Sequence, residues 1–145
     1  MVLAIDPGRQ KCGLALVSEE AVGHSRIHYR EVVETQRLVA RVLQLLNEYD
    51  PARILLGDGT QSAPLARALR DTLTGRLEVE LVPEAFTSQR ARERVRAQSL
   101  PRGLWRLVPS GMRTPVQPYD DLVAVILAED WFARQAGNSG ANDEP

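Results

Sequence analysis

Four carboxylates stand where the pattern of apolar residues predicts that buried elements begin or end. Asp6 follows the apolar run at residues 2–5, and Glu84 comes directly after another apolar strand. Asp120 and Asp121 open the last apolar helix. Residues at the carboxyl ends of strands in an open sheet share one edge, which is where such folds bind ligands. The sequence therefore predicts a site built from acids that lie far apart along the chain.

Three acids held close together would repel one another unless a cation lay between them. Mg²⁺ and Mn²⁺ suit such a site because hard divalent ions prefer oxygen ligands and can bridge a phosphate. Two ions about 4 Å apart could activate a water on one side of the phosphorus and stabilise the leaving oxygen on the other. We expect Asp6 to be the shared ligand, with Glu84 and Asp120 completing a catalytic site that hydrolyses phosphodiester bonds.

Each acid also has an ordinary local explanation. Asp6 precedes Pro-Gly and could simply form a turn, and Glu84 could be an exposed residue after a strand. Asp120 or Asp121 could be an N-cap favoured by the helix dipole. Helical phase places both on apolar stripes, so both are candidate metal ligands. Asp58 is a rival ligand, but its place between two glycines favours a turn.

The spacing of apolar residues predicts the elements that must position these acids. Strands are predicted at 2–5, 12–17, 22–29, 54–56 and 77–82, and helices at 34–47, 62–73, 87–98 and 120–134. This order predicts an α/β fold with a five-stranded mixed sheet and helices on both faces, as in an RNase H-like domain, although other open mixed sheets share it. The domain is expected to span 1–136, with a functional or mobile loop at 100–118 and a disordered tail at 137–145.

Composition limits the class of protein. With 145 residues, 43% of them hydrophobic, the chain can form one packed domain. It contains no apolar run long enough for a membrane span and no signal peptide pattern, so we expect a cytoplasmic protein without a membrane partner. Cys12 is the only cysteine, which excludes an intramolecular disulfide and a thiolate metal cluster. We expect it to be a buried strand residue.

The formal net charge of −1 does not predict a nucleic-acid partner, but the distribution of charge is uneven. Seven arginines and a single acid, Glu93, lie between residues 90 and 113. The candidate nucleic-acid-binding residues are Arg9, Lys11, Thr87, Ser88, Arg90, Arg94 and Arg96. A solvated charged helix is the alternative for the arginines. Trp105 could stack on a base or anchor its loop, and His24 and His28 are expected to face solvent with no catalytic role.

Three motifs together resemble the YqgF/RuvX family. They are AIDPG at 4–8 followed by GLA at 13–15, VPEAFTS at 82–88, and DDLVAVIL at 120–127. Proteins of this RNase H-like family are described as Holliday junction resolvases and as nucleases that process pre-16S ribosomal RNA. The resemblance covers about residues 2–134 and implies that Asp6, Glu84 and Asp120 bind the metal. Pro83 and Ala85 depart from the family pattern, as does GDGT at 57–60, and these departures bear on substrate preference.

Two other classes of protein share some of these features. The actin-like ATPase fold also has an acidic first turn, but it needs two lobes and this chain supplies one. A non-catalytic nucleic-acid-binding module would keep the fold and its basic residues without needing three acids. The sequence does not separate RNA from DNA, junctions from single strands, or endonuclease from exonuclease action. A homodimer would suit symmetric cutting of branched substrates, although no interface can be predicted.

Overall fold

The computed structural model describes residues 1–84, 93 and 120–139. Within this part, five strands form one mixed sheet in the order β3-β2-β1-β4-β5. The strands are β1 (Val2–Asp6), β2 (Lys11–Ala21), β3 (His24–Glu34), β4 (Ile54–Gly57) and β5 (Val79–Val82). The first three are antiparallel neighbours, whereas β4 runs parallel to both β1 and β5.

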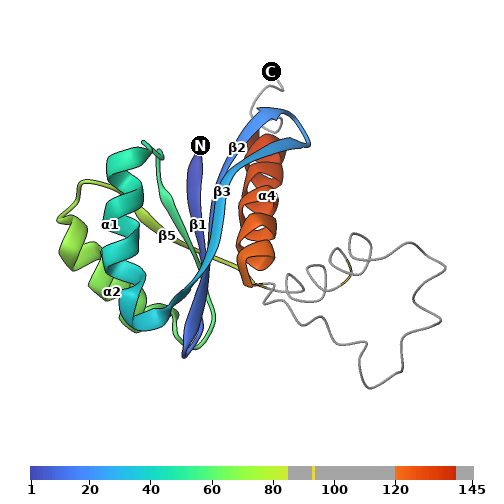
Figure 1. The fold of residues 1–145 in the computed structure, drawn as a ribbon. Helices are drawn as coiled ribbons and strands as arrows, with labels where there is room; N and C mark the ends of the chain where they lie inside the picture. Colours follow the sequence, from blue (N-terminus) through green and yellow to red (C-terminus); the bar gives the residue numbers. More distant parts are fainter. Residues whose placement is uncertain (85–92, 94–119, 140–145) are drawn as a thin grey trace, which may run out of the picture.

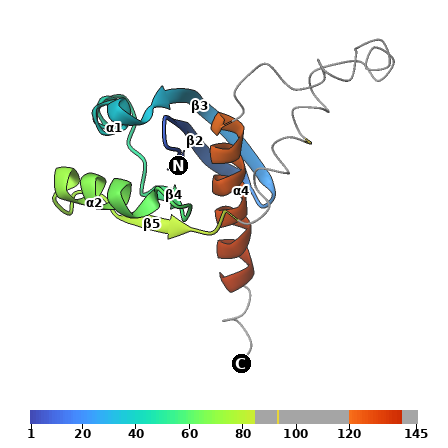
Figure 2. The same cartoon turned by 90° about the horizontal axis from the view of Figure 1, so that it is seen from below.

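Helices cover both faces of this sheet (Figures 1 and 2). The short η1 (Thr35–Arg37), α1 (Leu38–Glu48) and α2 (Ser62–Leu73) follow β3 and β4, and α1 and α2 lie on one face. The long α4 (Asp120–Ser139) crosses the other face. The predicted RNase H-like arrangement, a five-stranded mixed sheet between helices, is confirmed.

Two hydrophobic layers explain why the first strand is apolar throughout. Leu3 and Ile5 pack toward α1 and α2, while Val2 and Ala4 pack toward α4. Successive side chains of a strand point to opposite faces, so a strand covered on both sides needs apolar residues at every position. All four are nearly or fully inaccessible to solvent. Because this strand is buried, it fixes the position of its last residue, Asp6, at the edge of the sheet.

The predicted end of the third strand was wrong. Residues 22–29 were assigned to it, whereas β3 continues to Glu34 as the second arm of a long hairpin with β2. The hairpin turns at Gly23, whose φ of +78° suits glycine. Residues 30–34 mix charged and apolar side chains without a regular alternation, so apolar periodicity did not show that backbone pairing with β2 continues through them. The helix predicted from residue 34 therefore begins later, as η1 and then α1.

The last helix is longer than the predicted range of 120–134. α4 continues through Ser139, so residues 137–139 are helical. A glycine inside a helix costs about 1 kcal/mol, which a helix already anchored by packing tolerates. The hydroxyl of Ser139 donates a 3.0 Å hydrogen bond to the carbonyl of Gln135 in the last turn. Residues 140–145 lie outside the described part, and the domain boundary at 136 stays a prediction.

Several predictions fall on residues that the structure does not describe. The helix at 87–98 is described only at Glu93, which is helical and exposed, and the loop at 100–118 with Trp105 lies outside the described ranges. Cys12 is fully buried, as predicted. None of the described helices combines the length and apolar character needed to cross a membrane.

Candidate active site

The two parallel strand pairs and the start of α4 bring three acids to one edge of the sheet. Asp6 ends β1, and Glu84 lies two residues beyond β5. Because β1, β4 and β5 are parallel, their carboxyl ends meet at this edge. Asp120, the first residue of α4, reaches the same place because the backbone of α4 lies against Gly13, the β2 partner of Asp6.

The approach of α4 to β2 depends on a missing side chain. A Cβ atom built on Gly13 would collide with the backbone carbonyl of Asp120 and with the backbone nitrogen of Asp121. Only a glycine allows this close contact between a strand and the first turn of a helix. The backbones of β2 and α4 therefore approach closely at Gly13, which places the start of α4 beside the end of β1.

Asp6 and Glu84 are in direct contact, and their carboxyl groups share a hydrogen bond. Burial, followed by the negative charges of Glu84 and Asp120, raises the pKa of Asp6 to about 8. The hydrogen bond favours the proton on Asp6, because it raises the pKa of Asp6 and opposes the increase at Glu84. Without a cation, this site therefore holds a proton at neutral pH.

The pKa values of the other two acids are raised as well. At Glu84 the main cause is burial, followed by the charge of Asp58. At Asp120 it is again burial, followed by the charge of Asp121, while the nearby Lys11 acts in the opposite direction. Acids whose protons are favoured by burial and by like charges are the groups that a divalent cation would deprotonate and hold together.

Glu84 sits in a space that two glycines leave open. A Cβ atom on Gly57 would collide with the Glu84 carboxylate, and one on Gly59 would lie 2.7 Å from its Oε2. Between them, Asp58 accepts a 3.0 Å hydrogen bond from the backbone N–H of Glu84 through Oδ1. A turn was favoured for this segment over a ligand role for Asp58, and its contact with Glu84 was not predicted. The repeated glycine at 57 and 59, close to a strand end, was the available signal.

The side chains of Asp120 and Asp121 interact with different groups. Oδ2 of Asp121 lies 3.4 Å from Nε of Arg30 on β3, and Oδ1 of Asp121 accepts a 2.9 Å hydrogen bond from the backbone N–H of Leu122. Asp120 instead acts electrostatically on Asp6. Asp121 thus has an ion-pair partner of its own, Arg30, which sequence reasoning missed.

The three acids have the oxygen donors that a hard divalent cation needs, but their side chains are not grouped closely enough to hold one. Three carboxylates at one edge supply the oxygen ligands that Mg²⁺ and Mn²⁺ prefer, and Asp6 and Glu84 already touch. Yet within residues 1–84, 93 and 120–139, no three acidic, histidine or cysteine side chains form a group that could hold a metal ion. Metal binding at this edge would therefore require the side chains to draw closer.

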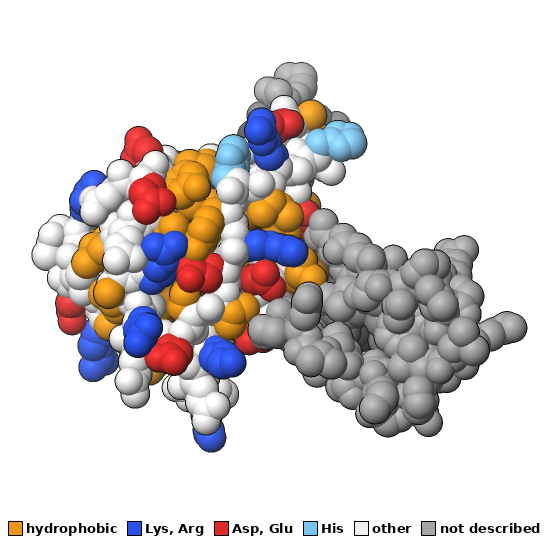
Figure 3. Space-filling view, in the orientation of Figure 1, with side chains coloured by type: hydrophobic (Ala, Val, Ile, Leu, Met, Phe, Trp, Pro, Cys, Tyr) orange, Lys and Arg blue, Asp and Glu red, His pale blue; other side chains and the backbone are white. Residues whose placement is uncertain are grey.

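Of the predicted nucleic-acid-binding residues, Arg9 and Lys11 lie exposed at the turn between β1 and β2. Thr87, Ser88, Arg90, Arg94 and Arg96 lie outside the described residues. Among the described residues on the face seen in Figure 3, basic and acidic side chains are interspersed and form no continuous basic patch. His24 and His28 are exposed, and Nε2 of His28 lies 2.7 Å from the Ser18 hydroxyl.

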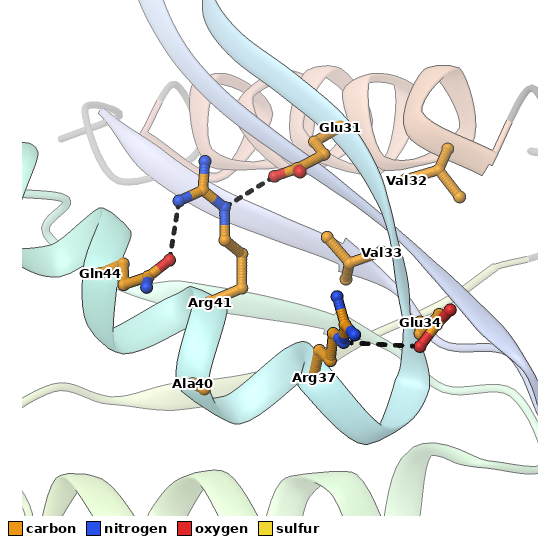
Figure 4. A pocket seen from close by; sticks show the side chains of 8 residues that line it. All are labelled: Glu31, Val32, Val33, Glu34, Arg37, Ala40, Arg41 and Gln44. Atoms are coloured by element: carbon orange, nitrogen blue, oxygen red, sulfur yellow. Dashed lines mark hydrogen bonds and ion pairs between the residues drawn. The ribbon is translucent and has the colours of Figure 1, made fainter.

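A pocket of about 580 Å³ lies between β3 and α1, on the face of the sheet opposite α4 (Figure 4). Its polar groups pair with one another. Arg41 donates to Glu31 at 2.7 Å and to Gln44 at 2.9 Å, and Arg37 lies 3.6 Å from Glu34. Because these charges are already compensated, this pocket is a poor candidate for the chemistry.

The fold and the position of the acids can now be compared with known proteins. No protein-family model matches the chain, and no curated protein sequence matches it. Solved structures do match. Thermus thermophilus RuvC in complex with a Holliday junction substrate has a TM-score of 0.60 and 23% identity over 94% of this chain and 96% of that one.

Two further resolvases are similar in fold. Fowlpox virus resolvase with Holliday junction DNA has a TM-score of 0.59 at 11% identity, covering 92% of this chain and 97% of the other. The yeast mitochondrial Holliday junction resolvase Ydc2 has a TM-score of 0.57 at 15% identity, covering 93% and 78%. The chain therefore has an RNase H-like α/β fold of the kind found in these RuvC-like resolvases.

Proposed function

We propose that this protein is a divalent-metal-dependent nuclease that hydrolyses phosphodiester bonds. The observation that carries the proposal is the contact between Asp6 and Glu84 at the sheet edge, with Asp120 close enough to add to the raised pKa of Asp6. Acids gathered from β1, β5 and α4 have no structural benefit at this edge, because burial and mutual repulsion disfavour their charged forms. Such an arrangement is typical of a functional site.

In this proposal Asp6, Glu84 and Asp120 would hold Mg²⁺ or Mn²⁺. When bound, the metal would supply an activated water and stabilise charge on the leaving oxygen. On metal binding, Asp6 would release to solvent the proton that it holds at neutral pH. Gly57, Asp58 and Gly59 keep Glu84 in place, and Asp121 serves by pairing with Arg30 rather than as a ligand.

The substrate we propose is RNA, as in pre-16S ribosomal RNA processing, with branched or single-stranded DNA as further substrates. The motifs that resemble the YqgF/RuvX family support RNA and support membership of that family. The similarity in fold to resolvases solved with Holliday junction DNA supports branched DNA. A homodimer fits the branched substrate, because two symmetric cuts need two sites.

A non-catalytic nucleic-acid-binding module is the second candidate. It is favoured by one observation, namely that no three potential ligands in the described part are grouped to hold a metal ion. In that case the acids at the sheet edge would hold protons rather than cations. Cleavage and binding therefore have to be measured separately.

The experiment is cleavage of labelled single-stranded RNA, single-stranded DNA and a four-way junction with Mn²⁺, Mg²⁺ or EDTA. It compares the native protein with Asp6→Asn and with Asp71→Asn, an exposed acid on α2 that serves as the matched control. We expect metal-dependent cutting that Asp6→Asn loses and Asp71→Asn keeps. Binding without cutting under every condition would instead establish the binding module.

A further inference from the structure

A second feature of the same sheet edge is a shallow pocket of about 330 Å³ beside the turn between β1 and β2. Two segments far apart in sequence form it, namely this turn and the chain that leaves β3 through η1. The residues that line it are Arg9, Gln10, Lys11, Glu34, Thr35 and Gln36. We call it the turn pocket.

Hydrogen bonds fix the two walls of the turn pocket to each other. The backbone N–H of Thr35 donates a 2.8 Å hydrogen bond to the carbonyl of Gln10, and its hydroxyl donates one of 2.8 Å to the carbonyl of Gly8. The thiol of Cys12 lies 3.4 Å from the same hydroxyl. The pocket is therefore a built part of the fold.

The balance of charge in the turn pocket is positive. Arg9 and Lys11 contribute two cations, and Glu34 is the acid among the residues that line it. The carboxylate of Glu34 lies 3.6 Å from Nε of Arg37, which belongs to η1 and points toward it (Figure 4). Two cations against one acid, which also pairs with Arg37, give the pocket a net positive charge that attracts an anion. Gln36 adds an uncharged amide group to the lining.

The turn pocket lies next to the acids. Its first residue, Arg9, follows Asp6 by three positions, and Lys11 begins β2 two residues before Gly13, which lies against the backbone of Asp120. An anion in the pocket would therefore lie beside the carboxylates without touching them. A nucleic-acid strand offers phosphates at regular intervals, so one phosphate can reach the acids while a neighbour reaches the cations.

We propose that the turn pocket binds a backbone phosphate of the nucleic acid that flanks the phosphate at the acids. This rests on the proposed function and adds to it a subsite for positioning the strand. Arg9 and Lys11 neutralise the flanking phosphate, and Gln36 provides an uncharged hydrogen-bond donor. Contacts to phosphate set register and affinity and do not read sequence.

The test measures binding of a labelled four-way junction and of a labelled single strand in EDTA, over a series of salt concentrations. The dissociation constant rises with salt, and the slope counts the phosphates neutralised. We expect Arg9→Gln to weaken binding about threefold to tenfold and to reduce the slope by about one. Gln36→Ala should weaken binding without changing the slope, because its side chain is uncharged. Arg67→Gln, an exposed arginine on α2, is the matched control and should change neither.

The outcomes separate the pocket from the nuclease. Normal binding with an unchanged slope in Arg9→Gln overturns the turn pocket and leaves the nuclease proposal standing. The expected change in slope, together with no cleavage in Mg²⁺ or Mn²⁺, supports the pocket and overturns the nuclease. If the native protein binds neither nucleic acid at any salt concentration, both proposals are overturned.

Discussion

The backbone N–H of Glu84 donates a hydrogen bond of 3.0 Å to Oδ1 of Asp58. The backbone N–H of Asp58 in turn donates one of 2.9 Å to the carbonyl of Val82, the last residue of β5. These two bonds join the segments that follow β4 and β5 beyond the end of the sheet. They hold the chain at Glu84 so that its carboxylate fits over Gly57 and Gly59 and meets Asp6.

Asp58 is therefore expected to act by positioning Glu84. Asp58→Ala should lower cleavage about tenfold, since a lost hydrogen bond is worth about 1 kcal/mol or slightly more. Asp58→Asn keeps the Oδ1 acceptor and should stay within about threefold of the native rate. Cleavage rates at saturating metal measure this difference. Equal losses in both variants would mean that the charge of Asp58, and not its hydrogen bond, is what matters.

The two neighbouring acids of α4 should behave differently. Asp120→Asn removes a proposed ligand and is expected to lower cleavage about 100-fold or more. Asp121→Asn removes a partly exposed ion pair with Arg30 but keeps an acceptor for the backbone N–H of Leu122. It should cost about threefold at most. Cleavage rates of the two variants in Mn²⁺ test this prediction. A larger loss in Asp121→Asn than in Asp120→Asn would make Asp121 the ligand.

A methyl group at Gly13 should displace the start of α4. Gly13→Ala places a Cβ atom against the Asp120 carbonyl, so we expect a loss of about 1 to 3 kcal/mol in the free energy of unfolding. Cleavage should also fall, because a shift of about 1 Å at a reacting group can cost about 100-fold. Gly137→Ala, in α4 with open space around it, is the control and should be neutral or slightly stabilising. If Gly13→Ala and Gly137→Ala have the same Tm and the same cleavage rate, the close contact between Gly13 and α4 is contradicted.

Stability should depend on pH and metal through Asp6. Its pKa is about 8 in the folded protein and about 4 when unfolded. Between these values the folded state holds a proton that the unfolded state has lost, so the free energy of unfolding falls as pH rises. In EDTA, the Tm of the native protein should fall more between pH 4 and pH 8 than the Tm of Asp6→Asn. Each kcal/mol lost from the free energy of unfolding lowers the Tm by about 4 °C. Mg²⁺ or Mn²⁺ should restore the native Tm at pH 8, and parallel pH profiles would rule out the raised pKa.

Local sequence patterns predicted the elements with apolar periodicity. The strand at the N-terminus, the helix Ser62–Leu73 and the apolar start of the last helix are where the pattern placed them, because burial demands apolar residues at set intervals. The same pattern failed along the last residues of β3, where Arg30 and Glu31 interrupt the apolar alternation and pairing with β2 continues the strand. It also failed at the end of α4, which continues past Gly137.

The sequence by itself determined that acids follow buried strands, and hence that Asp6 and Glu84 would share a sheet edge. Only the tertiary structure decided how the rest of the site is arranged. It separates Asp120 from Asp121 by pairing the latter with Arg30, from a strand about ninety residues earlier. It also shows that Gly57 and Gly59 make room for Glu84. Both relationships join residues that are distant in the chain, and helical phase or turn propensity describes only near neighbours.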